Sequence, residues 1–179
     1  MSHEEAIFAG GCFWCTEAVF GQLKGVSGVE SGYIGGHVAD PSYKEVCGGN
    51  TGHAEAIRIS FDPAVINYGD LLQIFFATHD PTQLNRQGND IGTQYRSAIF
   101  PLSDEQRAAA EEGILAAATD WPSPIVTTIE GPATWYPAED YHQEYWDGEG
   151  QRNPYCLAVI PPKLAKLKKS FAERLNDSA

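Results

Sequence analysis

The chain has 179 residues, of which 42% are hydrophobic and 20% are charged. This composition is typical of one globular domain with enough apolar residues for a core. The formal net charge of -12 disfavours nucleic acid as a partner, because phosphate binding needs a basic surface. No apolar run approaches the roughly 20 residues of a membrane-spanning helix, and the acidic start lacks the apolar segment of a signal peptide. We therefore expect a cytoplasmic protein with a single domain over residues 1–179.

The first half of the chain alternates between the patterns of strands and helices. Residues 57–61 alternate apolar and polar side chains, which predicts a strand with one buried face. The helices show apolar residues three and four apart, and Gly25 ends the first of them. In order, the pattern predicts a strand at 5–9, a helix at 16–24, strands at 26–36 and 57–61, and a helix at 68–78.

The second half begins with a polar loop at 79–95, which is long enough to suggest a functional loop. Beyond it the pattern predicts a strand at 96–101, a helix at 103–118, a strand at 124–130, a short helix at 138–146, a strand at 157–160 and a helix at 163–175. The last helix is amphipathic, and we expect its lysines to point outward as a solvated face. The interleaved elements predict one α/β or α+β domain.

Four cysteines are present, and without a secretory signal they suggest redox or catalytic thiols rather than structural disulfides. Cys12 follows two glycines after the first strand and precedes a helix. Unpaired backbone N–H groups and the helix dipole at such a position favour the thiolate form. Phe13 and Trp14 beside this sulfur could form an apolar pocket. The cysteines are Cys12, Cys15, Cys47 and Cys156.

Cys12 and Cys15 form a C-x-x-C pair, which has three possible interpretations. A zinc site would need a second cysteine pair or two histidines at metal-binding spacing, and neither is present. We therefore predict no metal site. Two inert buried thiols remain an alternative. A redox pair fits better, in which one sulfur attacks a substrate and the other closes a disulfide upon it.

His53 and Glu55 lie two residues apart in an extended segment, so they share one face. If burial raised its pKa, Glu55 could act as a general acid. A solvated strand end is the alternative. The H-x-E order also occurs in zinc deaminases, but there the cysteine pair follows the histidine. The polar loop at 84–96 matches neither a P-loop nor a dinucleotide fingerprint.

Taken together, six segments resemble the A-type peptide-methionine sulfoxide reductases, which act on the S epimer of methionine sulfoxide. The segments are residues 10–14, 32–33, 41–43, 51–55, 87–97 and 138–143. They occur in order from about residue 6 to residue 146, and a C-terminal segment with the basic helix follows at 147–179. The resemblance implies one catalytic domain with a two-layer α/β (α+β) sandwich, a ferredoxin-like core, and a mixed sheet with packed helices.

The same resemblance implies a role for each matched residue. Cys12 is the nucleophile, and Phe13 and Trp14 bind the methyl group of the substrate. Glu55 protonates the sulfoxide oxygen. The substrate is methionine sulfoxide in proteins or peptides, and also as the free amino acid.

Three further residues complete the site implied by the resemblance. The hydroxyl groups of Tyr43 and Tyr95 assist the acid, and Asp90 orders the site through hydrogen bonds. No resident cofactor is implied, because an external dithiol, thioredoxin, serves as reductant. We expect a monomer without nucleic-acid or membrane partners.

The resolving cysteine is where the chain departs from the family's commonest form. Many members have glycine at the position of Cys15 and place resolving cysteines in a glycine-rich C-terminal tail. We favour Cys15 here, because the loop from Cys12 is very short, with Cys156 as the alternative and Cys47 as a bystander. Two other functions remain to be tested, a general thiol–disulfide oxidoreductase and a non-enzymatic redox-sensing module.

Overall fold

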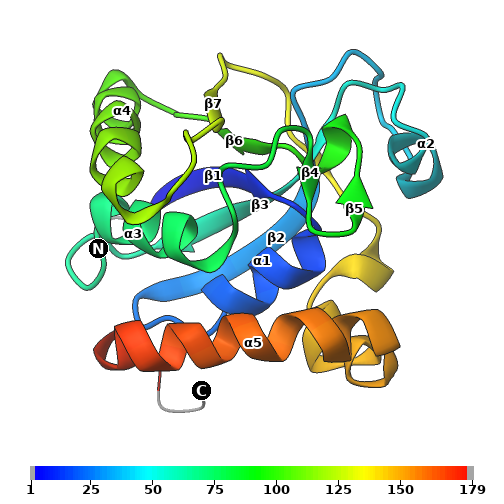
Figure 1. The fold of residues 1–179 in the computed structure, drawn as a ribbon. Coiled ribbons are helices and arrows are strands. Elements are labelled where there is room, and N and C mark those ends of the chain that lie inside the picture. The colour runs from blue at the N-terminus through cyan, green and yellow to red at the C-terminus, as the bar shows by residue number, and fades with distance from the viewer. Residues whose placement is uncertain (1–2, 177–179) are drawn as a thin grey trace.

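The computed structural model describes residues 3–176 (Figure 1), so the ends of the domain expected at 1–179 lie outside the described residues. Six strands form one sheet in the order β7-β6-β1-β3-β2-β8. Neighbouring strands are antiparallel except β6 and β7, so the sheet is mixed, as expected. The strands are β1 (Glu4–Gly10), β2 (Val26–Ile34), β3 (Ala54–Phe61), β6 (Ser97–Ile99), β7 (Thr128–Ile129) and β8 (Tyr136–Pro137).

The four central strands have the ferredoxin-like arrangement. Their order is β6-β1-β3-β2. Helix α1 (Phe13–Phe20) connects β1 to β2, and α3 (Tyr68–Thr78) lies between β3 and β6. This is the split β-α-β pattern, so the expected core is confirmed.

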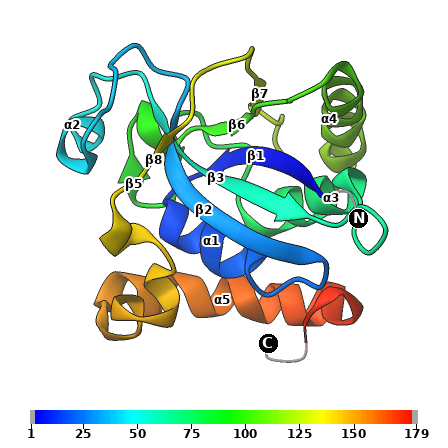
Figure 2. The ribbon, with the colours of Figure 1, turned by 180° about the vertical axis from the view of Figure 1, so that it is seen from behind.

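Four helices cover one face of this sheet. They are α1, α3, α4 (Asp104–Ala117) and α5 (Pro154–Phe171), and all contribute to one hydrophobic cluster with the sheet. The opposite face carries a smaller cluster and shows strands and loops when the molecule is seen from behind (Figure 2). The molecule is therefore the two-layer sandwich that we expected.

Alternation along the strands sets which side chains enter each cluster. Phe8 of β1 and Ile57 and Ile59 of β3 face the helices, whereas Ile7 faces the other side. Phe8 stacks on Phe75 of α3 with ring centroids 4.9 Å apart. The prediction of one buried face for residues 57–61 is confirmed.

The strand predicted at 157–160 is wrong, because these residues lie within α5. Asn153 caps this helix by accepting from the N–H of Tyr155, 2.9 Å away. Pro161 and Pro162 lie inside the helix and lack N–H groups for the carbonyls of residues four positions earlier. Those two carbonyls belong to exposed residues, so water can satisfy them.

Several other boundaries differ from the sequence-based expectation. Helix α1 begins at Phe13 rather than at 16 and ends at Phe20. The strand expected at 124–130 is limited to β7, and the helix expected at 138–146 is two short 3-10 turns. The loop at 79–95 contains a hairpin of β4 (Arg86–Gln87) and β5 (Asp90–Ile91). Helix α2 (Tyr43–Cys47) was not predicted, although Ser42 and Glu45 form its capping box.

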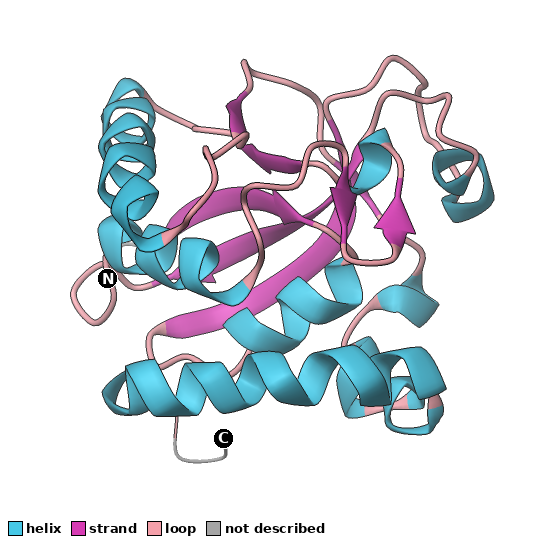
Figure 3. Cartoon of the chain, viewed as in Figure 1, coloured by secondary structure: helices cyan, strands magenta, loops and turns pink. Residues whose placement is uncertain are grey.

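The hairpin, α2 and the first turns of α5 lie on the side of the molecule where α1 begins (Figures 1 and 3). This end therefore combines segments that are distant in sequence. Among the described residues, none of the helices has the length and apolar character of a bilayer-spanning segment.

Candidate active site

Cys12 is the N-cap residue of α1, directly after the end of β1. Gly11 permits this turn, because its φ is 94° and a Cβ there would lie 2.7 Å from the Cβ of Gln87. The side chain of Cys12 is 7% exposed. Cys12 is therefore a nearly buried residue of the cluster that also holds Cys15.

The two thiols of the C-x-x-C pair contact each other in the first turn of α1. The N–H of Cys15 donates to the carbonyl of Cys12 at 3.0 Å. Burial, followed by the hydrogen bond to Cys15, raises the pKa of Cys12 well above its ordinary value. The hydrogen bond from Cys12 lowers the pKa of Cys15. The expectation that Cys12 rests as a thiolate is therefore wrong, because burial outweighs the helix terminus.

Glu55 lies beside this pair on β3. Its Oε1 accepts the backbone N–H of Phe13 at 3.1 Å. The side chain is 1% exposed, and burial raises its pKa to about 8 even though the Phe13 N–H opposes the shift. Its Oε2 is buried without a hydrogen-bond partner among the described residues. At neutral pH the group is therefore mostly a neutral acid with one free oxygen.

His53 does not join Glu55 in this role. Its Nδ1 accepts the N–H of Gly36 at 3.0 Å, and its Nε2 lies 2.7 Å from the carbonyl of Val38. These partners assign the proton to Nε2. His53 therefore fixes the loop that follows β2.

Tyr43 and Tyr95 come from α2 and from a 3-10 turn at Thr93–Tyr95. Burial raises the pKa of both phenols, and the Glu55 carboxyl raises them further. Both hydroxyl groups hydrogen-bond the thiol of Cys47, which is exposed. The hydroxyls keep their protons at neutral pH, and Cys47 packs against Tyr43 as expected, while its lack of a role in the chemistry stays a prediction.

Asp90, on β5, accepts a hydrogen bond from the hydroxyl of Tyr155 on α5. That hydroxyl also interacts with the sulfur of Cys15. Sequence reasoning missed Tyr155, because it lies in a segment that was assigned no role. Asp90 is thus linked to the sulfur pair through the C-terminal helix.

Aromatic rings surround the start of α1. Phe13 is fully buried, with ring centroids 5.7 Å from Tyr33 and 5.1 Å from His142. Trp14 is half-buried, stacks on Tyr145 at 4.0 Å, and donates its indole N–H to Nδ1 of His142 at 3.0 Å. Nε2 of His142 has no partner among the described residues. These rings form an apolar wall with few polar groups.

Two residues of the 138–143 segment brace this wall, although sequence reasoning gave them no role. Glu139 accepts from the hydroxyl of Tyr33 at 2.8 Å and from the N–H of Tyr43 at 2.9 Å. Gln143 accepts from the N–H of Ser31 at 2.8 Å and donates to its carbonyl at 2.9 Å. Both residues lie in one of the six segments that resemble the family, and this was the sequence signal that could have identified them.

Cys156 is also close to the pair. It is fully buried in a cluster with Cys12, Cys15 and Ile160. Burial, and then Cys15, raise its pKa to about 11. Cys156 is therefore a protonated thiol at neutral pH, and it is held within α5.

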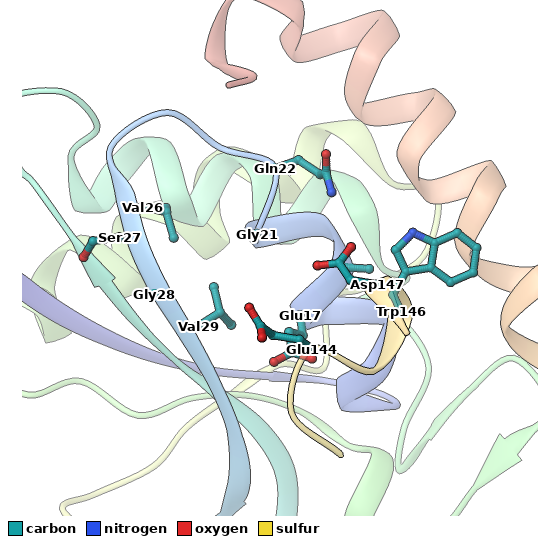
Figure 4. Close-up of a pocket in the computed structure, with 11 residues that line it drawn as sticks. Glu17, Gly21, Gln22, Val26, Ser27, Gly28, Val29, Glu144, Trp146 and Asp147 are labelled. Atoms are coloured by element: carbon teal, nitrogen blue, oxygen red, sulfur yellow. The ribbon is translucent and has the colours of Figure 1, made fainter. Parts of the chain in front are cut away.

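A separate hollow of about 160 Å³ lies between the C-terminal part of α1, β2 and the turn at Tyr145–Asp147 (Figure 4). Glu17, Glu144 and Asp147 contribute carboxyl groups to its lining. Glu17 is 6% exposed, and burial raises its pKa to about 7. Cys12 does not line this hollow, so it is distinct from the sulfur site.

The structure thus brings together all the residues expected at the site: Cys12, Phe13, Trp14, Cys15, Tyr43, Glu55, Asp90 and Tyr95. In the range 3–176, no three side chains of His, Cys, Asp or Glu are arranged to hold a metal ion. The arrangement combines a pair of thiols, a neutral acid and an apolar wall, which suits chemistry at a polar group that carries a small apolar substituent.

Comparison with known proteins gives a consistent result. A family model described as peptide methionine sulfoxide reductase matches residues 4–175. "Peptide methionine sulfoxide reductase MsrA" of Erwinia tasmaniensis is 71% identical over 172 residues, which cover 96% of this chain and 97% of the relative.

Solved structures agree with the sequence relatives. Mxr1 from Saccharomyces cerevisiae in reduced form has a TM-score of 0.77 and 36% identity, covering 83% of this chain and 87% of that chain. Mxr1 in complex with Trx2, at 24% identity and a TM-score of 0.56 over 80% of this chain and 84% of that chain, shows the same fold. The chain therefore belongs to the peptide methionine sulfoxide reductase family and is an oxidoreductase of the MsrA type.

Proposed function

We propose that this enzyme reduces the S epimer of methionine sulfoxide, in peptides and as the free amino acid, with Cys12 as nucleophile. The observation that carries the proposal is the hydrogen bond of 3.1 Å from the Phe13 N–H to Glu55. It holds a mostly neutral carboxylic acid beside the start of α1, where Cys12 lies. The free Oε2 of Glu55 is then available to the sulfoxide oxygen.

The first step is loss of the Cys12 proton and attack of the resulting thiolate on the electrophilic sulfur of the substrate. Negative charge develops on the sulfoxide oxygen, which Glu55 protonates. The hydroxyls of Tyr43 and Tyr95 donate to the same oxygen, and such hydrogen bonds to a charged group contribute about 1.5–3 kcal/mol each. The acid is required because expulsion of an unprotonated oxygen is very unfavourable.

The methyl group of the substrate lies against Phe13 and Trp14. The half-buried ring of Trp14 offers the apolar surface next to the sulfur, and the fully buried ring of Phe13 supports the wall from within the core. Trp14 is fixed by its hydrogen bond to His142 and its stacking on Tyr145. This wall orients the substrate so that its oxygen faces Glu55.

Atoms and electrons balance without a cofactor. The attack forms a bond between the two sulfurs. The protonated oxygen then bonds to the Cys12 sulfur, and the bonds from the substrate sulfur to this oxygen and to Cys12 break, so methionine leaves and Cys12 becomes a sulfenic acid. The proton that Cys12 loses is compensated by the proton that the oxygen gains. Substrate sulfur is reduced by two electrons and Cys12 is oxidised by two.

The sulfenic acid then condenses with Cys15, and water leaves. Cys15 already contacts Cys12 within one helical turn and has a lowered pKa, owing first to the hydrogen bond from Cys12. Cys156 is the alternative. Its thiol has a pKa of about 11 because of burial, and α5 holds it in place, so we favour Cys15.

Recycling of the disulfide requires an external dithiol, and we propose thioredoxin. The support is the solved complex of Mxr1 with Trx2, which has this fold. We further propose that residues 1–179 act as one catalytic domain, as a monomer, in the cytoplasm.

Activity on each sulfoxide epimer, with dithiothreitol as reductant, tests the reaction. We expect reduction of the S epimer only, and none after Cys12→Ser. Activity on the R epimer, or insulin reduction without sulfoxide activity, would contradict the proposal and favour a general thiol–disulfide oxidoreductase.

Peptide mapping after one turnover without reductant tests the resolving thiol. We expect a disulfide between Cys12 and Cys15, with Cys156 free. A bridge from Cys12 to Cys156 with Cys15 free would assign the role to Cys156 instead.

A further inference from the structure

Lys163 lies on the buried face of α5, contrary to the expectation that the lysines of this helix point outward. It follows Ile160 by three residues, and both Ile160 and Leu167 on this face are buried. The side chain is half-buried. Its Nζ donates to the carbonyl of Thr78 at 2.9 Å. Thr78 ends α3, so the ammonium is fixed at the negative end of a helix dipole.

Lys163 lies one helical turn from Ile160, which packs in the same cluster as the sulfur pair. Helix α5 packs on α1 through the cluster that contains Cys15 and Ile160. Lys163 attracts negative charge on both sulfurs, and its attraction to Cys15 is the larger. Burial lowers the pKa of Lys163, and this attraction counters the shift.

The groups that interact with Cys15 are Cys12, Lys163, Tyr155, Asp90, Glu55 and Cys156. The hydrogen bond from Cys12 lowers the pKa of Cys15 most; burial opposes this, and Lys163 and Tyr155 lower it further. Asp90 raises it, but its carboxylate accepts from Tyr155. Lys163 is the cation in this set.

We propose that Lys163 is a positioning residue for disulfide formation: its ammonium, held by the Thr78 carbonyl on the face of α5 that packs toward Cys15, favours attack of the Cys15 sulfur on oxidised Cys12. This inference rests on the proposed function, in which Cys15 is the resolving thiol. Lys163 does not touch the substrate. It acts through Cys15.

The chemistry needs no additional oxidant. The Cys15 thiolate attacks the sulfur of the Cys12 sulfenic acid, a sulfur–sulfur bond forms, and the sulfur–oxygen bond breaks. The departing hydroxide takes a proton and leaves as water. A thiolate is required because the neutral thiol is a poor nucleophile, so the fixed charge of Lys163 matters before this step.

The first test measures the ionisation of Cys15 directly. In a Cys12→Ser, Cys47→Ser, Cys156→Ser background, the hydroxyl at position 12 can still donate to Cys15. Alkylation of Cys15 with iodoacetamide is followed against pH by mass spectrometry. We expect Lys163→Met to raise the midpoint by about one pH unit, which slows alkylation at neutral pH roughly tenfold.

Two variants serve as controls for this measurement. Lys168→Met removes the same charge from an exposed position of α5, and we expect no shift. Lys163→Arg keeps a positive charge, and we expect it to restore the profile if charge, rather than packing, is responsible. The proposal would be overturned if Lys163→Met and Lys168→Met had the same alkylation midpoint. It would also be overturned if Lys163→Arg raised the midpoint as much as Lys163→Met does.

The second test follows one turnover by rapid quenching in otherwise unmodified enzyme. We expect Lys163→Met to slow disulfide formation about tenfold relative to methionine release, so that Cys12 sulfenic acid accumulates. Equal rates of disulfide formation in Lys163→Met and Lys168→Met would refute the role. A disulfide between Cys12 and Cys156 would show that Cys15 is not the resolving thiol of the proposed function. The proposed role of Lys163 would then also be wrong, even if Lys163→Met moves the alkylation midpoint of Cys15.

Discussion

Burial affects two glutamates of this protein in the same direction but with different consequences. Desolvation penalises the charged form of both, so the pKa rises to about 8 at Glu55 and about 7 at Glu17. Glu55 lies between the sulfur pair and the tyrosines, where a neutral acid is useful. Glu17 lies on the other side of α1 and accepts the N–H of Tyr145 at 3.3 Å. The first shift suits the acid role proposed for Glu55, whereas the second is a cost in stability.

Replacement of Glu55 tests the acid. Glu55→Gln cannot donate a proton, so we expect methionine release in a single turnover to slow about a hundredfold, within the usual range of general acid catalysis. In the wild type, release should also decline as pH rises through about 8, where the carboxyl loses its proton. The variant should lack this decline. An equal decline in methionine release at high pH in both proteins would contradict the assignment of Glu55 as the acid.

Replacement of Glu17 tests the second shift through the pH dependence of stability. The folded-state pKa of about 7 exceeds the unfolded value of about 4.3. The folded state therefore binds more protons between these values, and the wild type loses stability as pH rises through them. We expect Glu17→Gln to match the wild type near pH 4 and to be about 1–2 kcal/mol more stable at pH 8, discounted for partial solvent screening.

Urea unfolding of both proteins at pH 4 and pH 8 measures this difference. Glu111→Gln, at an exposed position of α4, is the control and should change little at either pH. A Glu17→Gln variant that is less stable at pH 8 would show that the hydrogen bond to Tyr145 needs the charge.

At the scale of the elements, periodicity predicted the parts that pack on the core. The strands β1, β2 and β3 and the helices α3 and α4 followed from apolar spacing, because one face of each is buried. The errors fall where periodicity is weak. Helix α5 was divided because Pro161 and Pro162 interrupt an apolar run, and α2 is too short to show a period.

The predictability of the site follows the same division. Cys12 and Glu55 could be found because each lies next to a strand with a clear pattern. Tyr155 and Lys163 could not, because they reach the site only through the packing of α5 on α1, which the local sequence does not specify. The resemblance to a known family added Tyr43, Tyr95 and Asp90, but not the residues from the C-terminal segment.

The prolines of α5 give a prediction at this scale. Pro161→Ala restores an N–H that can pair with the carbonyl of Leu157, which is exposed. We expect the free energy of unfolding to rise by about 1 kcal/mol, because the helical gain exceeds the loss of chain stiffness in the unfolded state. Pro154→Ala is the control, since proline suits the first position of a helix. If urea unfolding shows the same change in the free energy of unfolding for both variants, the missing N–H of Pro161 does not destabilise α5.

For the molecule as a whole, the active site joins the two ends of the chain. Helix α1 supplies the sulfur pair, and α5 covers it with Tyr155, Cys156 and Lys163. The residues that follow the C-terminus of α5 are also hydrogen-bonded to the segment after α1. The N–H of Lys24 donates to the carbonyl of Arg174 at 2.7 Å, and Gln22 accepts from Asn176 at 2.8 Å.

These hydrogen bonds predict that a short C-terminal deletion affects the whole fold. Deletion of 172–179 removes both backbone hydrogen bonds, the packing of Leu175 against the main cluster and the ion pair of Arg174 with Asp70 at 3.0 Å. At about 1 kcal/mol per hydrogen bond and less for the ion pair, we expect a loss of about 2–3 kcal/mol. Thermal unfolding should then show a Tm lower by roughly 4–12 °C. Deletion of 177–179 alone keeps all of these contacts and is the control. If the two deletions lower Tm equally, the contacts of residues 172–176 with the segment after α1 do not contribute to the stability of the fold.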